Sequence, residues 1–546
     1  MKLFRSIIFI CVLFLPASRS LHAQMECSMD NYDVKFYALD LTLSDTNTNL
    51  HGSASIGMEI VSPSDLICLE LGNQLKVESV MHNGKDVFFS HANDLLEVKG
   101  IFLPGMFDTI KVFYHGDGNS KDQFGALFNY SYATLGGFTY SLTEPYSTKY
   151  WFPCKQNIAD KADSVFLNIS VPKHLKVGSN GVLIDVVDID SGFHQFQWKS
   201  LYPTSYFLVS VSVGNYIDYS FEVELPYAET SLPVVNYIYN DSIYLRTNKP
   251  DIDTTAHLIR LFSELFGPYP FIKEKYGHCV APMGGGMEHQ TMTTLGNFGF
   301  DLVAHELAHQ WFGNMVSCSH WNHIWIHEGF ASYCEYLALE FSGYPDEAAL
   351  WLEDAMERAS QAHYGSVYIP DSLVNDVSRI FSHQLSYKKG AVLVHMLRCE
   401  INNDTLFFDL LKAFLQEYAY RVASADDFKM LAETITGRSF EMFFRQWYYG
   451  SGYPIIEAEW QQCGEILKIR VQQSPIKGSS SDFFQFSLPC LVTTEIGDTL
   501  VYLELYAVES EFEINLKQSV HEIMPDPENN YLIQTDRINQ KPCNDD

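Results

Sequence analysis

Hydrophobic and polar residues alternate along short stretches between Tyr32 and Tyr219. Residues 37–43 read YALDLTL and residues 53–60 read SASIGMEI, so every second side chain is apolar. Alternation of this kind is typical of strands that bury one face. Turn clusters such as HNG at 82–84 separate the stretches. Because no helical period of any length interrupts them, the pattern predicts an N-terminal all-β domain, arranged as a saddle or sandwich of sheets.

The pattern becomes helical near residue 251 and returns to strands near residue 453. Helical spacing of apolar residues occurs at 254–266, 348–363, 390–400, 406–417 and 426–436. A GSGYP sequence then breaks the chain, and strand-like runs follow it. We therefore expect a multidomain α+β chain with a mixed domain between two β-domains. The predicted division is an N-terminal β-domain at 24–228, a mixed domain at 229–452, a small C-terminal β-sandwich at 453–535 and a polar, frayed tail at 536–546.

The stretch from Asp301 to Glu335 carries the strongest chemical signal. It begins DLVAHELAHQWFGN and ends WIHEGFASYCE. His305 and His309 are four residues apart, which places both imidazoles on one helix face, one turn apart. Eighteen residues then separate His309 from Glu328, enough to end one helix, reverse and begin a second. Two histidines and one glutamate with an open fourth position form a catalytic zinc set, with one Zn²⁺ per chain.

Glu306 lies between the two histidines and projects beside the metal, where it could take a proton from a bound water. The alternative is an amphipathic helix with two surface histidines and an unrelated glutamate. Against this, no helix breaker occurs between Leu302 and Phe312, and Gly313 with Asn314 supplies a helix stop. The second segment also has the apolar run of a buried helix, so the context favours a metal site.

Two further carboxylates could belong to a substrate site. Residues 280–294 read VAPMGGGMEHQTMTT, and consecutive glycines suit an edge strand that an extended peptide approaches closely. Glu288 at its end could hold a free α-ammonium; a flexible glycine loop with a solvated glutamate is the alternative. Glu144 lies near the aromatic segment KYWFPC at 149–154, where a packed aromatic corner is the alternative. A carboxylate in such surroundings still needs a cation.

Composition limits which cellular compartment and which binding partners are expected. The chain has 546 residues, of which 47% are hydrophobic and 19% charged, as in ordinary globular proteins. A formal net charge of −31 argues against nucleic acid and anionic membranes as partners. Lys2 and Arg5 precede an apolar run at 7–15, which predicts a signal peptide at 1–23 and export to the periplasm or the extracellular medium. A membrane anchor is the alternative, but the run is too short to span.

Cysteine usage gives no metal motif. Cys11 lies in the predicted signal peptide, and the ten other cysteines form no C-x-x-C pair. A zinc ribbon is therefore not indicated. In an oxidising compartment some of the ten can pair, but the sequence does not give the connectivity.

The chain resembles the aminopeptidase N family of zinc metallopeptidases (gluzincins), as a short exported form without the family's long C-terminal helical domain. The resemblance rests on HELAHQWFGN, on the spacing to HEGF and on the strand sequence GGMEH, and it extends from Tyr32 to about Leu532. It implies a thermolysin-like α/β catalytic domain at the centre of the chain. It also implies hydrolysis of single N-terminal residues from peptides that have a free N-terminus.

The same resemblance assigns roles to single residues of this sequence. The implied roles are zinc ligation by His305, His309 and Glu328, general base catalysis by Glu306, oxyanion stabilisation by Tyr387 of YKKGA, substrate binding by Glu144, Gly285, Gly286, Met287 and Glu288, and orientation of a ligand histidine by Glu335.

Three positions depart from the family pattern. His289 stands where the family usually has Asn, and Gly286 stands where Ala is common. His327 stands where Asn usually precedes the third ligand. We expect His289 to affect the pocket for the first side chain, and none of the three changes touches a ligand or the base.

Functions of other classes remain open. A thermolysin-like endopeptidase would share the zinc set but lack the amine anchors. A non-catalytic scaffold of the same fold would be expected to lose ligands or the base, and here all of them are present. An epoxide hydrolase activity exists in one branch of the family, and nothing in this sequence selects it.

Overall fold

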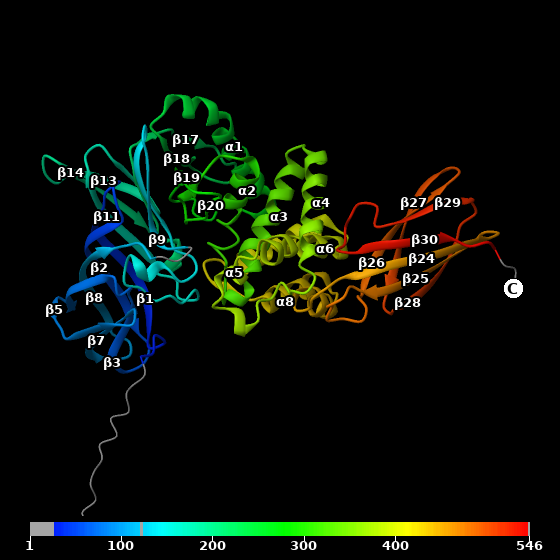
Figure 1. Ribbon diagram of the computed structural model, residues 1–546, viewed down its shortest axis with the longest axis horizontal. Coiled ribbons are helices and arrows are strands. Elements are labelled where there is room, and N and C mark those ends of the chain that lie inside the picture. The colour runs from blue at the N-terminus through cyan, green and yellow to red at the C-terminus, as the bar shows by residue number, and fades with distance from the viewer. Residues whose placement is uncertain (1–26, 121–123, 544–546) are drawn as a thin grey trace, which may run out of the picture.

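The computed structural model describes residues 27–120 and 124–543. Three regions follow one another along its longest axis (Figure 1): a blue-to-cyan β-rich region, a green-to-yellow region with most of the helices, and an orange-to-red β region. The predicted multidomain α+β architecture is confirmed. The signal peptide predicted at 1–23 lies outside the described residues, and the domain boundaries stay a prediction.

The N-terminal region consists of three sheets. Its strands are β1 Tyr32–Thr42, β2 Asn49–Ile60, β3 Ser64–Glu70, β4 Leu75–His82, β5 Lys85–Asp86, β6 Phe89–Ala92, β7 Leu95–Phe102, β8 Phe107–Asp117, β9 Ala126–Tyr132, β10 Gly136–Leu142, β11 Ser164–Pro172, β12 Lys176–Ser179, β13 Val182–Asp188, β14 Phe193–Ser200 and β15 Val211–Gly214. The sheet orders are β13-β14-β11-β1-β2-β8-β4-β5, β12-β15-β10-β9 and β3-β7-β6. In β1, Tyr37, Leu39 and Leu41 are buried at every second position, as the alternation predicts.

The central region combines a mixed sheet with helices. Its main sheet has the order β16-β18-β19-β21-β20, with β17 on β18, from β16 Tyr216–Asp218, β17 Phe221–Val223, β18 Leu232–Tyr239, β19 Tyr276–Val280, β20 Gly286–Met287 and β21 Thr293–Leu295. A second, two-stranded sheet joins β22 Ser317–Cys318 to β23 Val422–Ala423. The helices are α1 Ser242–Phe266, α2 Phe300–Ala308, α3 Trp325–Phe341, α4 Pro345–Gln361, α5 Val377–Ile380, α6 Gly390–Ile401, α7 Asp404–Glu417, α8 Ala425–Thr436 and α9 Glu441–Phe443. Two π-helical segments, His383–Lys389 and Phe444–Tyr448, complete this region.

Two helices differ from the sequence prediction in length. α1 begins twelve residues before the predicted start at 254, because Asp241 caps its first turn by accepting from the Ile243 N–H. Buried positions in α1 start only at Ile252, so the first turns carry no amphipathic signal. α2 ends at Ala308 and not near residue 312, since the chain tightens there into i→i+3 hydrogen bonds.

The C-terminal region is a two-sheet β-sandwich, as predicted. Its strands are β24 Pro454–Cys463, β25 Ile466–Pro475, β26 Phe486–Thr494, β27 Gly497–Leu505, β28 Glu509–Asn515, β29 Val520–Pro525 and β30 Gln534–Gln540, in the orders β28-β25-β24-β30 and β27-β26-β29. The prediction of a frayed tail is wrong for the described residues. β30 pairs in parallel with β24, and a Cys463–Cys543 disulfide fastens the segment that follows it.

The described residues contain a second disulfide, Cys27–Cys68, which ties the start of the described chain to β3. The other described cysteines are free, and most of them are buried. Within the described residues, no helix combines the length and the apolar character that a membrane crossing requires.

Candidate active site

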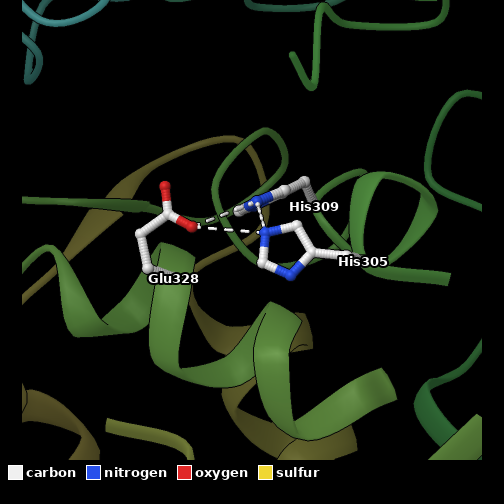
Figure 2. Close-up of side chains that lie close together, drawn as sticks. All are labelled: His305, His309 and Glu328. Atoms are coloured by element: carbon white, nitrogen blue, oxygen red, sulfur yellow. Dashed lines mark hydrogen bonds and ion pairs between the residues drawn. The ribbon is translucent and has the colours of Figure 1, made fainter. Parts of the chain in front are cut away.

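The predicted metal ligands come from two neighbouring helices. His305 belongs to α2, His309 caps its C-terminus, and Glu328 lies in the first turn of α3. All three side chains are buried or nearly so. Figure 2 shows both imidazoles and one Glu328 carboxylate oxygen pointing at one another.

The spacing of the three donor atoms fits a tetrahedral metal ion. The two Nε2 atoms of His305 and His309 lie 3.1 Å apart, and Glu328 Oε2 lies 3.3 Å and 3.6 Å from them. Donors about 2.0–2.2 Å from a tetrahedral zinc are separated by about 3.3 Å. The three side chains can therefore bind one small cation with little movement.

Hydrogen bonds on the far side of each ring leave both Nε2 atoms as acceptors. His305 Nδ1 donates to Glu335 Oε1 at 2.8 Å, and His309 Nδ1 donates to the Phe312 carbonyl at 3.0 Å. In the neutral rings the lone pairs then face the Glu328 carboxylate. Three acceptors that converge without a donor require a cation between them, which is the arrangement of metal-binding histidines.

Three hydrogen-bond donors hold the side chain of Glu335, which lies on α3. It accepts from His305 Nδ1, from Trp351 Nε1 at 2.7 Å and from Lys388 Nζ at 3.1 Å. Burial alone would raise the pKa of Glu335, but the bond from His305 and the Lys388 charge hold it below its usual value. The geometry agrees with the predicted orienting role, and Trp351 and Lys388 are two supporting residues that the sequence analysis missed.

Glu306 faces the cavity from α2. Its side chain is buried and Oε2 has no hydrogen-bond partner. Burial raises the pKa of Glu306 to about 8. The backbone at Gly286 comes so close that a Cβ there would lie 2.5 Å from Glu306 Oε1. The glycine therefore leaves room for the proposed base.

The cavity has a volume of about 420 Å³. All of the predicted site residues line it: Glu144, Gly285, Gly286, Met287, Glu288, His305, Glu306, His309, Glu328, Glu335 and Tyr387. The residues of its lining that were not predicted are Phe124, Leu142, Gly284, Asp301, Leu302, Phe381 and His383. Phe124 of the N-terminal region meets Phe381 edge-to-face, with ring centroids 5.4 Å apart, so the wall joins two regions of the chain. No local sequence pattern signals such a contact.

One wall of the cavity is the short strand β20, which pairs antiparallel with β21 and ends the sheet order. This outer position agrees with the predicted edge strand. Among the described strands none pairs with its other side, so the backbone there is open to an extended ligand.

Glu288 and Glu144 form the acidic end of the cavity. Both are nearly inaccessible, and each has an Oε1 atom without a hydrogen-bond partner. Burial, followed by the charges of Glu288, Glu328 and Glu306, raises the pKa of Glu144 well above its usual value; burial likewise raises the pKa of Glu288. Two buried carboxylates without a donor constitute a strong site for a cation.

Tyr387 lies on the π-helical segment His383–Lys389, a geometry that often occurs at functional sites. Its ring stacks on His305, with centroids 6.0 Å apart. Burial and the surrounding carboxylates raise the pKa of Tyr387 well above its usual value. The hydroxyl therefore stays protonated and can donate a hydrogen bond.

His289 does not line the cavity. Its side chain is fully buried, and Nδ1 makes a 2.9 Å hydrogen bond with Thr294 Oγ1. Burial lowers the pKa of His289 to about 3, so the ring is neutral. Any influence of this residue on the first substrate side chain is therefore indirect.

The family description "Peptidase M1 N-terminal domain" matches residues 30–208, and "Peptidase family M1 domain" matches residues 287–447. Together the two matches cover more than half of the chain. The chain belongs to peptidase family M1, which confirms the resemblance seen in the sequence.

Individual relatives are distant. Aminopeptidase M1-D of Oryza sativa subsp. japonica is 25% identical over 79% of this chain and 51% of its own length. Aminopeptidase N of Lactococcus lactis subsp. lactis is 32% identical over 29% of this chain and 19% of its own length. The chain thus spans at most about half the length of these relatives. An M1 zinc metallopeptidase from Deinococcus radiodurans, solved as a mutant bound to a Tyr-Ser-Ala substrate, has a TM-score of 0.66 at 23% identity, over 77% of this chain and 94% of that one, and shows that the fold is shared.

Proposed function

We propose that this protein is a zinc-dependent aminopeptidase that removes single N-terminal residues from peptides. The observation that carries the proposal is the pair of buried, unpartnered carboxylates, Glu144 and Glu288, in the same cavity as three converging metal donors. Such a cavity needs one cation at the three metal donors and a second cation at the two carboxylates. A peptide supplies the second as its α-ammonium and thereby places its first peptide bond at the metal.

Zinc fits the donor set better than Mg²⁺ or Ca²⁺. Two imidazoles and one carboxylate in a tetrahedral arrangement are typical zinc ligands, whereas Mg²⁺ and Ca²⁺ prefer oxygen ligands. Bound zinc supplies a water of lowered pKa and polarises the scissile carbonyl.

The residues of the chain perform the other steps. Glu306 takes a proton from the attacking water at its free carboxylate oxygen and passes it to the leaving amine. Tyr387 donates its hydroxyl proton in a hydrogen bond to the carbonyl oxygen as negative charge develops there. Glu288 and Glu144 bind the ammonium and so fix which peptide bond reaches Glu306.

The relatives support the same function. The two relatives named above are aminopeptidases by name, and the Deinococcus structure is described as bound to a Tyr-Ser-Ala substrate. A thermolysin-like endopeptidase would have no use for two buried carboxylates beside the metal, because internal peptide bonds carry no ammonium. The presence of every ligand and of the base argues against a non-catalytic scaffold.

The test is a panel of aminoacyl fluorogenic amides, assayed with and without a chelator. We expect cleavage of free-amine substrates, loss of activity with the chelator, recovery on addition of Zn²⁺, and about one zinc per chain. The matched control is the same panel with N-acetylated amino groups, which should be cleaved at least a hundredfold more slowly. Equal cleavage of the two panels would remove the aminopeptidase assignment and leave an endopeptidase.

We further propose that the protein is exported to the periplasm or beyond. The basic and apolar start of the sequence supports this, and so do the Cys27–Cys68 and Cys463–Cys543 disulfides, which suit an oxidising compartment. Mass spectrometry of the native protein should find a mature N-terminus at Gln24, and fractionation should find it outside the cytosol. A cytosolic protein that retains Met1 would contradict the proposal.

A further inference from the structure

His327 lies beside Glu144 at the acidic end of the cavity. It directly precedes the metal ligand Glu328 on α3, yet its Nδ1 atom lies 3.9 Å from Glu144 Oε1. The side chain is fully buried, and its ring packs beside Phe207 and Trp321, each with a centroid separation of 6.2 Å. The two neighbouring rings restrict the orientation of the His327 ring beside Glu144.

Hydrogen bonding determines which ring nitrogen carries the proton. The backbone N–H of Cys318 donates to His327 Nε2 at 2.9 Å. Nε2 is therefore the acceptor, and the neutral ring carries its proton on Nδ1. Neither Nδ1 nor Glu144 Oε1 has any other hydrogen-bond partner, and both atoms are buried. A donor and an acceptor without other partners face each other.

We propose that His327 is a positioning residue, which donates its Nδ1 proton to Glu144 and holds that carboxylate where it receives the α-ammonium of the substrate. The inference rests on the proposed aminopeptidase function. A separation of 3.9 Å exceeds a hydrogen bond, but contacts of this kind are often long without substrate and shorten in the complex. Because the donor is neutral, it orients Glu144 without cancelling the charge that attracts the ammonium.

A second metal ion is the competing occupant of the same place. Glu144, Glu288 and His327 offer ligand atoms that all lie within 4.8 Å of one another. However, Nδ1 can bind a metal only as a lone-pair donor, which moves the ring proton to Nε2. That proton would oppose the N–H of Cys318, so the hydrogen bond favours an ammonium held by two carboxylates.

Two amide substitutions separate the two nitrogens of His327. In His327→Asn the side-chain amide can place an N–H near the position of Nδ1, while the acceptor for Cys318 is lost. In His327→Gln the amide oxygen can replace Nε2 as the acceptor, while the donor to Glu144 is lost. We expect His327→Asn to keep the KM for a free-amine aminoacyl amide within about threefold of wild type. We expect His327→Gln to raise that KM at least tenfold, with kcat within about threefold and about one zinc per chain in both variants.

The reverse order of the two variants, or an unchanged KM in His327→Gln, would overturn the inference and leave a purely structural ring. A second equivalent of zinc that disappears in His327→Asn would overturn it in favour of a metal site. If wild type cleaves no free-amine substrate, the proposed function fails and this inference fails with it. If wild type cleaves free-amine substrates and His327→Gln has an unchanged KM, only this inference fails and the proposed function stands.

A measurement on the unaltered full chain does not depend on how the variants fold. In protein labelled with ¹⁵N-histidine, the ring nitrogens report which one is protonated, and coupling across the hydrogen bond from the Cys318 N–H identifies the signal of His327. We expect the Nδ1–H form in the free enzyme. The Nε2–H form would overturn the proposal even if both variants misfold.

Discussion

The two ends of the cavity differ in how their polar groups are partnered. At the metal end, each histidine has a hydrogen-bond acceptor behind it, and Glu335 behind His305 is itself held by Trp351 and Lys388. At the amine end, Glu144 and Glu288 each have a buried oxygen with no donor. At the metal end the chain therefore orients the histidines with its own contacts, whereas at the amine end the two carboxylates obtain a donor only when a ligand arrives. A structure built in this way should bind its metal persistently and its substrate reversibly.

The largest expected effect is on the general base at the metal end. Glu306→Gln should lower kcat about 10²–10⁴-fold, because the amide cannot accept the proton of the attacking water. Zinc content, measured by elemental analysis, should stay near one per chain, since the donor group of His305, His309 and Glu328 does not include Glu306. Near-normal turnover in this variant would show that another group acts as the base.

The next largest effect is expected at Glu335, which accepts a hydrogen bond from the metal ligand His305. Glu335→Gln should weaken metal affinity about 10–100-fold, because His305 loses a charged acceptor. A chelator competition assay measures this, and Glu340→Gln on the same helix is the matched control, since Glu340 pairs with Arg398 and not with a ligand. Equal metal affinity in both variants would mean that Glu335 does not orient the site.

At the amine end, Glu144→Gln should raise KM about tenfold for free-amine substrates while zinc content stays unchanged. The reason is the loss of one of the two charges that bind the ammonium. Steady-state kinetics measures the change, and a competitive inhibitor that lacks the amine should keep its affinity. Loss of zinc together with activity would show that the two ends of the cavity are not separate.

The smallest effect concerns the room beside the base. Gly286→Ala should lower kcat by a few fold, because the new Cβ would displace the Glu306 carboxylate. Gly284→Ala is the matched control, since a Cβ there meets nothing within 4 Å. If the two variants have equal kcat values, Glu306 tolerates the displacement and the tight approach has no catalytic meaning.

Features that depend on local periodicity could be predicted from the sequence. The alternation along β1 predicted a strand. The four-residue spacing of His305 and His309 predicted that the two side chains converge. The first turns of α1 were missed because their side chains are exposed and have no apolar period. The ordered end of the chain was missed because polar residues at 534–540 find partners in β24, about eighty residues earlier.

The supporting contacts of the site were harder to predict because they join distant segments. Trp351 and Lys388 are ordinary residues in the sequence and gain their role only where α4 and the π-helical segment meet α3. His327 was recognised as a departure from the family pattern, but its contact with Glu144 joins residues 183 positions apart. The sequence names the reactive groups more readily than the groups that orient them.

The shortness of β20 has a consequence for how substrates are selected. A two-residue edge can form only a few main-chain hydrogen bonds with a peptide. The peptide backbone beyond the first residues therefore adds little to the binding affinity. Affinity must then come mainly from the terminal amine and the side chain next to it. We expect tolerance of peptide length, with tripeptides and decapeptides that share their first two residues turned over at comparable rates.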